Sequence, residues 1–71
     1  MSKTTTRHGD HGDLVTELQQ KLIAHGEDPG SVDGRFGDQT RAALMAFQMG
    51  HNLEVDGVVG QHTWAALDGE H

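Results

Sequence analysis

The chain has 71 residues, no cysteine, and five Lys/Arg against eleven Asp/Glu, so its formal net charge is −6 with six neutral histidines. Such a chain has room for one small core, which typically gives a net stability of about 3–5 kcal/mol. Without cysteine, neither a disulfide nor a Cys-ligated zinc can add to it. Its acidity argues against nucleic acid and anionic membranes as partners. Its apolar runs are far shorter than the roughly 20 residues of a membrane span.

The N-terminal third predicts a polar tail followed by one amphipathic helix. Residues 1–6 are typical of a disordered tail, and because no hydrophobic stretch follows them we expect no secretory signal. An apolar stripe then predicts a helix over about residues 13–25, with Gly26 in the left-handed position just past its end. Gln19 lies largely off this stripe, which consists of Leu14, Val15, Leu18, Leu22 and Ile23.

Two further helices follow. The spacing of Ala43, Leu44 and Phe47 predicts a helix over about residues 38–50, closed by Gly50, and Trp64 with Leu67 predicts a short helix over about residues 61–68. We expect residues 69–71 to fray. The connecting loops carry three apolar residues that we expect to anchor them, namely Val32, Leu53 and Val55. The fold expected is all-α, a compact three-helix bundle.

The second and third predicted helices, each with the loop before it, belong to an internal repeat. Residues 33–44 (DGRFGDQTRAAL) align with residues 56–67 (DGVVGQHTWAAL), and seven of the twelve aligned positions are identical. Asp-Gly favours a tight turn, because Asp bonds nearby backbone and Gly adopts positive φ without a clash. Phe36 and Val59 occupy the same place in each loop, where we expect both to plug the core. The sequence thus predicts a duplicated unit, an Asp-Gly loop followed by a helix.

These motifs resemble the peptidoglycan-binding type 1 domain. The resemblance covers about residues 7–68 and rests on Gly9-x-x-Gly12-x-x-Val15-x-x-Leu18-Gln19-x-x-Leu22, Val32-Asp33-Gly34-x-Phe36-Gly37-x-x-Thr40-x-x-Ala43, Phe47-Gln48, and Leu53-x-Val55-Asp56-Gly57-Val58-Val59-Gly60-x-x-Thr63-Trp64-x-x-Leu67. Asp38 and Gln61 stand where members of that family often have proline. The family's module usually accompanies a catalytic domain in cell-wall amidases, carboxypeptidases, muramidases and phage lysins.

The resemblance implies a non-catalytic module that binds peptidoglycan and targets an attached or associated protein to the bacterial wall. Partners would be the glycan or stem peptide of the wall and a cell-wall hydrolase domain. The place of action would be the cell wall, or the extracellular or periplasmic space after export by other means. The alternative is a structural or protein-interaction module, such as a phage or secretion-apparatus component or an adaptor.

Candidate contacts follow from the chemistry of that ligand. Arg35 and Arg41 are suited to gripping a stem-peptide carboxylate, with an ordinary surface charge as the competing interpretation. Trp64 is suited to stacking on a sugar face, with a core anchor as its alternative. The other candidates have helix capping, turn locking or backbone bonding as alternatives, and they are Gln48, Asp56, Gln61 and Thr63.

We expect no cofactor, metal site or catalysis. His8, Asp10, His11 and Asp13 could ligate a metal, but they lie in a Gly-rich segment before the first helix that would lose conformational entropy on binding one. The Asp-Gly loops lack the bidentate glutamate of a calcium loop, and no base accompanies the serines. The remaining histidines are expected to be exposed groups, with His25, His51 and His62 scattered near helix ends and His71 at the terminus.

Overall fold

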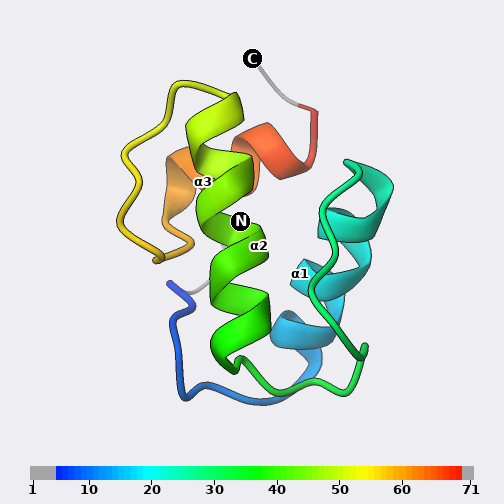
Figure 1. Cartoon of the computed structure of the whole chain (residues 1–71). Coiled ribbons are helices and arrows are strands. Elements are labelled where there is room, and N and C mark those ends of the chain that lie inside the picture. The colour runs from blue at the N-terminus through cyan, green and yellow to red at the C-terminus, as the bar shows by residue number, and fades with distance from the viewer. Residues whose placement is uncertain (1–4, 70–71) are drawn as a thin grey trace.

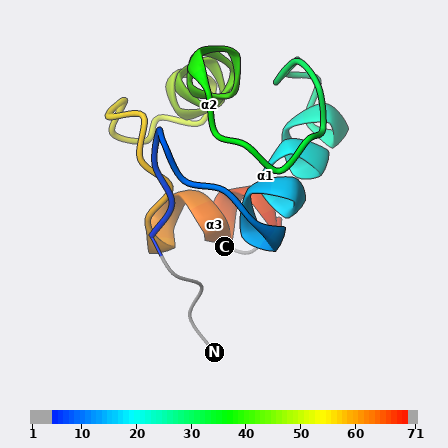
Figure 2. The ribbon, with the colours of Figure 1, turned by 90° about the horizontal axis from the view of Figure 1, so that it is seen from below.

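The computed structural model describes residues 5–69 and contains three helices and no strand within that range. They are α1 (Asp13–Ala24), α2 (Asp38–Gly50) and α3 (Gln61–Leu67). Figures 1 and 2 show them at the corners of a triangle, with the loops wrapped around the outside. The predicted three-helix, all-α fold is confirmed. No helix within the described range is long and apolar enough to cross a membrane.

One core fills the space between the helices. Phe36 and Val59, the predicted loop plugs, have 2% and 0% of their surface exposed and are confirmed as core residues. The other buried apolar side chains come from all three helices, and they are Val15, Leu18, Leu22, Ala43, Leu44, Phe47, Trp64 and Leu67. Both loops therefore close the bundle from the side, each with one apolar residue.

Three predicted apolar contacts are wrong. Ile23 is 52% exposed, because a residue five positions after Leu18 points about 140° away from it on a helix. Val32 and Val55 are 42% and 39% exposed. The loops that follow these two valines are held by hydrogen bonds from the helices instead. Leu53, the third expected anchor, packs against the core as predicted.

Residues 5–12 cross the bottom of the bundle and pair with both loops (Figure 2). Thr6 exchanges two backbone hydrogen bonds with Val59, at 3.1 and 2.8 Å, in the second loop. Further along, Gly9 N–H donates to the Phe36 carbonyl in the first loop at 2.9 Å. The N-terminal segment thus connects the two loops at their core-plugging residues.

This pairing corrects one boundary of the predicted tail. Thr6 is 2% exposed and belongs to the folded part of the chain. Its polar character suggested a tail, but its backbone pairs with a residue 53 positions later. The rest of the predicted tail over residues 1–4, and residues 70–71 of the predicted frayed end, lie outside the described residues.

Two residues beyond its last helical residue, each of α1 and α2 is followed by a residue with positive φ. Gly26 adopts φ 85° as predicted, and the next residue, Glu27, donates its N–H to the Leu22 carbonyl at 2.8 Å. The prediction that α2 ends at Gly50 is confirmed, and beyond it Asn52 takes the left-handed position with φ 57°. Asparagine tolerates that conformation better than most residues.

Candidate functional site

The first Asp-Gly loop is held from inside by Gln19, which is fully buried. Its Oε1 accepts the N–H of Gly34 at 3.0 Å. Its Nε2 donates to three acceptors, namely Asp33 Oδ1 at 3.2 Å, the Arg35 carbonyl at 2.9 Å and Thr40 Oγ1 at 3.1 Å. One side chain from α1 therefore sets the shape of the loop and joins it to the start of α2.

The second loop is held in the same way by Gln48 of α2, which is also fully buried. Its Oε1 accepts the N–H of Gly57 at 3.1 Å. Its Nε2 donates to Asp56 Oδ1 at 3.0 Å, the Val58 carbonyl at 3.0 Å and Thr63 Oγ1 at 3.3 Å. Each of these partners is the repeat equivalent of a partner of Gln19. That the two units arose by duplication stays a prediction.

The role of Gln19 was missed from the sequence. The spacing places it largely off the apolar stripe of the first helix, where glutamine is common. The available signal was the recurrence of a glutamine directly after a core residue, in Leu18-Gln19 and Phe47-Gln48. Because a buried amide must find partners for both ends, such a recurrence ahead of each Asp-Gly turn indicates a hydrogen-bonded loop.

Asp33 stabilises the first turn through its carboxylate. Its Oδ1 accepts the backbone N–H of Arg35 at 2.9 Å as well as the Gln19 amide. These hydrogen bonds, the Arg35 backbone bond first and the Gln19 bond second, lower the pKa of Asp33 below its ordinary value, although desolvation acts in the opposite direction. The carboxylate is therefore held in its charged form, and it faces the solvent beside Arg35.

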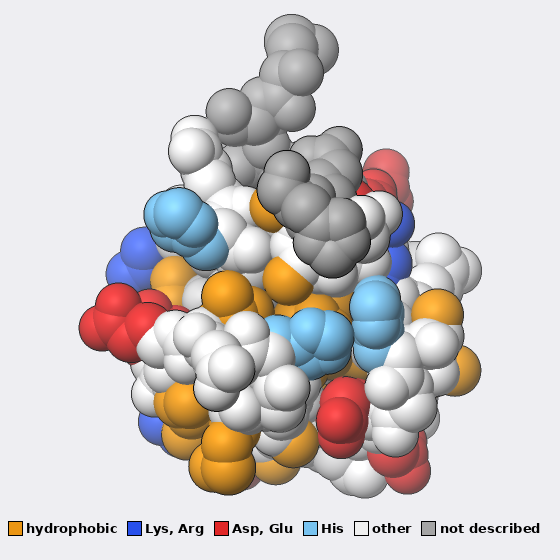
Figure 3. Space-filling view, turned by 90° about the horizontal axis from the view of Figure 1, so that it is seen from above, with side chains coloured by type: hydrophobic (Ala, Val, Ile, Leu, Met, Phe, Trp, Pro, Cys, Tyr) orange, Lys and Arg blue, Asp and Glu red, His pale blue; other side chains and the backbone are white. Residues whose placement is uncertain are grey.

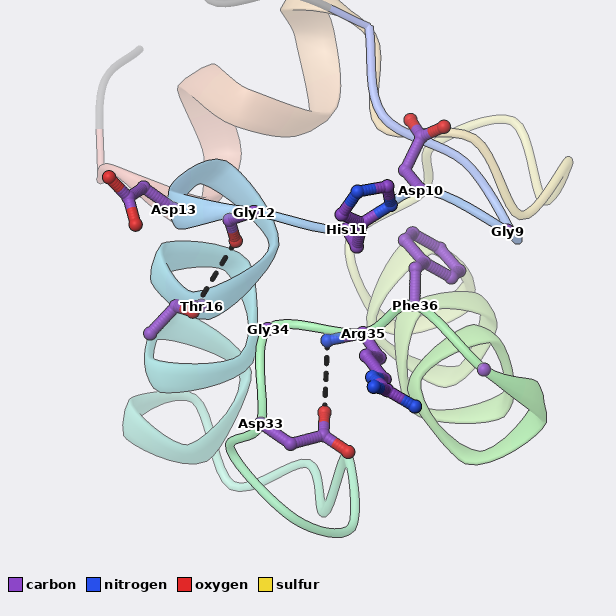
Figure 4. A pocket seen from close by; sticks show the side chains of 11 residues that line it. Gly9, Asp10, His11, Gly12, Asp13, Thr16, Asp33, Gly34, Arg35 and Phe36 are labelled. Carbon is purple, nitrogen blue, oxygen red and sulfur yellow. Dashed lines mark hydrogen bonds between the residues drawn. The ribbon is translucent and has the colours of Figure 1, made fainter.

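A groove of about 570 Å³ lies between the N-terminal segment and the first loop. Figure 4 shows residues 9–13 along one side and residues 33–36 along the other, with Thr16 on α1 at one end. The floor is closed by backbone pairing, including a hydrogen bond from Gly12 N–H to the Gly34 carbonyl at 2.9 Å. Its charged and titratable lining residues are Asp10, His11, Asp13, Asp33 and Arg35.

Each Asp-Gly loop also forms a smaller hollow with the start of the next helix. The first, of about 240 Å³, is lined by Pro29, Gly30, Ser31, Asp33, Arg35, Gly37, Asp38, Gln39 and Thr40. The second, of about 320 Å³, is lined by Asn52, Leu53, Glu54, Asp56, Val58, Gly60, Gln61, His62 and Thr63. Position by position, the two linings are repeat equivalents. The backbone shape recurs, whereas the cation Arg35 is replaced by Val58.

The structure distributes the predicted contact residues over different places. Arg35 is exposed and lines both the groove and the first hollow. Arg41 is exposed, and its side chain lies against the second loop at Gly57. A Cβ added to Gly57 would lie 3.2 Å from the Arg41 Nε. The second hollow is lined by three further candidates, of which Asp56 and Gln61 are exposed and Thr63 is buried. The candidates therefore do not form one site.

Two of the predicted contact residues lie in the interior. Gln48 has no exposed surface, and its amide is committed to the second loop. Trp64 is 3% exposed and belongs to the core cluster. A ligand cannot reach either side chain in this structure, so the interpretation of Trp64 as a core anchor is the correct one. Gln48 acts on the surface only through the loop that it holds.

The histidine-rich segment at the N-terminus makes contacts with the rest of the protein. His8 Nε2 lies 2.9 Å from Asp38 Oδ1, an exposed pair that joins the segment to the first turn of α2. Between residues 5 and 69, no group of three or more His, Cys, Asp or Glu side chains is arranged to hold a metal ion.

Comparison with known proteins identifies the family. The family described as "Putative peptidoglycan binding domain" matches residues 11–67, most of the chain. This chain belongs to that family. The resemblance stated from the sequence motifs is therefore confirmed, and the domain is a peptidoglycan-binding module of the kind found in cell-wall hydrolases.

Three relatives show the range of proteins that contain similar domains. The N-acetylmuramoyl-L-alanine amidase CwlM of Mycobacterium tuberculosis is 44% identical over 57 residues, which cover 80% of this chain and 14% of CwlM. An endolysin of the Burkholderia phage AP3 is 43% identical with a TM-score of 0.90, over 96% of this chain and 26% of that one. The SleB N-terminal domain is 39% identical with a TM-score of 0.92, over 97% of this chain and 94% of that one.

The curated relatives are longer proteins. This chain spans about half of the first of them and 14% of CwlM. The shared part is the three-helix domain, so the likeness extends to nearly the whole length of the SleB N-terminal domain but only to a part of the amidase and the endolysin.

Proposed function

We propose that this domain binds peptidoglycan in the groove between residues 9–13 and the first Asp-Gly loop, without catalysing a reaction on it. The observation that supports this site is the position of Arg35, the cation of the groove. Its backbone is fixed on both sides, because its carbonyl accepts from the Gln19 amide and its N–H donates to the Asp33 carboxylate. The fixed backbone defines where the side chain starts, and a guanidinium can grip a carboxylate with two hydrogen bonds.

The rest of the groove suits a ligand with mixed polar groups. Asp10 and Asp13 lie on the N-terminal side of the groove, where Asp10 Oδ2 accepts the Arg7 N–H at 3.1 Å and the remaining carboxylate oxygens are hydrogen-bond acceptors. Wall fragments carry N-acetyl amides, hydroxyls and amino groups that donate to such acceptors, and stem-peptide carboxylates that pair with Arg35. The acidic net charge of −6 opposes general attraction to an anionic wall, so recognition would depend on these local contacts.

The biological role that follows is targeting. A module of this size with one groove binds modestly, and many equivalent sites on the wall raise the effective affinity of whatever is linked to it. We infer that the domain serves an attached or associated protein, with a cell-wall hydrolase as the preferred partner class, because relatives such as CwlM and the AP3 endolysin carry it within longer proteins. Its place of action would be the bacterial wall.

The proposed site is tested by titrating the ¹⁵N-labelled domain with a disaccharide–tetrapeptide muropeptide. We expect the largest chemical-shift changes at residues 9–13 and 33–37. Arg35→Ala should weaken binding about fivefold, corresponding to roughly 1 kcal/mol for an exposed charge-assisted contact. Arg7→Ala is the matched control, because Arg7 is an exposed cation that does not line the groove.

Three outcomes separate the possibilities. Shifts in the groove with a loss only in Arg35→Ala support the site. Shifts centred on the second hollow, at residues 52–63, would retain peptidoglycan binding but move the site to the other loop. An absence of shifts with several muropeptides, combined with stoichiometric capture of one host or phage protein, would favour the alternative protein-interaction role.

A further inference from the structure

The C-terminal ends of all three helices gather at the end of the bundle opposite the groove (Figure 1). His25 and His51 are the residues that directly follow α1 and α2. They occupy equivalent positions, since each precedes the left-handed residue that ends its helix. The end of α3 joins them, because His25 Nε2 lies 2.9 Å from the carbonyl oxygen of Leu67, the last residue of α3.

The two imidazoles form a pair. Their ring centroids are 5.8 Å apart with an interplanar angle of 87°. Phe47 supports both from below, since the His51 ring stacks on it at 4.1 Å and the His25 ring meets its edge at 5.0 Å. Both histidines are exposed, and Figure 3 shows two histidine side chains next to each other on this end of the molecule.

The contact with α3 determines the tautomer of His25. A carbonyl oxygen only accepts, so Nε2 must carry the hydrogen, and in the neutral ring Nδ1 then holds the lone pair. Metal-ligating histidines are usually oriented by this kind of bond from the second ring nitrogen to a backbone carbonyl. His25 thus already has the outer contact that a metal ligand needs.

We propose that His25 and His51 together bind a divalent transition-metal ion of the Zn²⁺ type, with water completing its coordination. With metal–nitrogen distances near 2.0–2.1 Å and tetrahedral angles, two chelating rings have centroids about 5 Å apart. The observed 5.8 Å requires the two exposed rings to approach by less than about 1 Å and to turn toward a common point.

The electrostatic surroundings favour a cation at this place. The negative ends of three helix dipoles meet there, and these attract positive charge. Lys21, on the last turn of α1, is neutralised by its 2.7 Å ion pair with Asp68 after α3. An ion at this end would link α1 to α2 and strengthen the bundle without touching the groove.

The sequence did not indicate this pair, because the two residues lie 26 positions apart and neither belongs to a metal-binding motif. Their proximity follows from two helices of similar length ending side by side with the same type of cap. The proposal does not depend on peptidoglycan binding, since it concerns the other end of the bundle.

Isothermal titration of the untagged full chain with ZnCl₂, in a non-coordinating buffer near pH 7.5, tests the proposal. We expect one ion per chain, and at least about a tenfold loss of affinity in each of His25→Gln and His51→Gln. His62→Gln is the matched control, because His62 is exposed on α3 away from the pair and should leave binding unchanged. Zinc should also raise the melting temperature of the parent chain but of neither single variant.

Because His51 makes no hydrogen bond to α3, His51→Gln distinguishes loss of a ligand from loss of the His25–Leu67 contact. Circular dichroism confirms that each variant is folded before titration. The proposal is overturned if the parent chain binds no zinc, if both variants bind as tightly as the parent, or if binding is lost on replacing His8 and His11 instead.

Discussion

Replacing Gln19 with methionine keeps the length of the side chain but removes every hydrogen bond that it makes to the first loop. The N–H of Gly34 is buried and would lose its acceptor, which costs about 1–3 kcal/mol. The buried Thr40 hydroxyl would lose a donor, and the Asp33 and Arg35 oxygens, whose bonds to Gln19 are part-buried, would lose one donor each. We therefore expect a net loss of about 2–3 kcal/mol in the free energy of unfolding.

That loss is a large part of what a domain of this size has, about 3–5 kcal/mol, and corresponds to a fall of roughly 10–20 °C in melting temperature. Urea titrations followed by circular dichroism and by the fluorescence of the single tryptophan, Trp64, measure it. Gln48→Met should cost a similar amount through the second loop. Gln20→Met is the control, because Gln20 is exposed on the same helix and should change stability by less than about 0.5 kcal/mol.

Gln19→Glu separates hydrogen bonding from packing. A carboxylate oxygen would face three acceptors, so the pKa of the new side chain should be raised in the folded state. Its protonated form then stabilises the fold below the unfolded value of about 4.3, and that contribution is lost as the pH rises through the folded pKa. Equal stability of Gln19→Met and Gln20→Met, or no gain for Gln19→Glu at low pH relative to the parent chain, would refute this account of the loop.

Other substitutions test the remaining parts of the fold. Gly34→Ala should destabilise by more than about 1 kcal/mol, because Gly34 has φ 75° and a Cβ there would lie 2.9 Å from Thr16 Oγ1. Gly37→Ala, with open space for a Cβ and negative φ, should cost less than Gly34→Ala in the same urea titration. Asn52→Ala should lower the melting temperature more than Asn52→Gly, because only glycine and asparagine adopt φ 57° readily. Because the pKa of Asp33 is lowered in the folded state, its ionised carboxylate stabilises the fold above about pH 4, and this stabilisation is lost as the pH falls further. Denaturation from pH 7 to pH 3 should therefore show a stability advantage of the parent over Asp33→Asn that shrinks with acidity, and a constant difference would contradict this.

The helices and the loop plugs could be predicted because they depend on local spacing. Apolar residues recur with a helical period, and Phe36 and Val59 are each confined between two glycines of a short loop. Val32 and Val55 show the limit of this reasoning, since an apolar residue in a loop is buried only if the loop turns it inward. In both loops the hydrogen bonds of a buried glutamine determine that turn.

The contacts that shape the site are long-range, which explains why the sequence did not show them. Gln19 has the same local pattern as a surface glutamine, and only the closing of the first loop over α1 buries it. Thr6 looks like part of a polar tail, yet its backbone pairs with Val59 at the far end of the chain. Arg35 could be recognised as a candidate, whereas its place opposite residues 9–13 depends on that N-terminal pairing.

The central claim, that the groove beside the first Asp-Gly loop binds the bacterial wall, is tested most directly by co-sedimentation with purified insoluble sacculi, using chitin and cellulose as comparison polymers. The account predicts that the parent domain and Arg7→Ala are retained on sacculi alone, and that Arg35→Ala is retained several-fold less while keeping its melting temperature. Equal retention of Arg35→Ala and the parent would contradict the proposed groove, and failure of the parent to bind sacculi of several wall types would contradict wall binding itself.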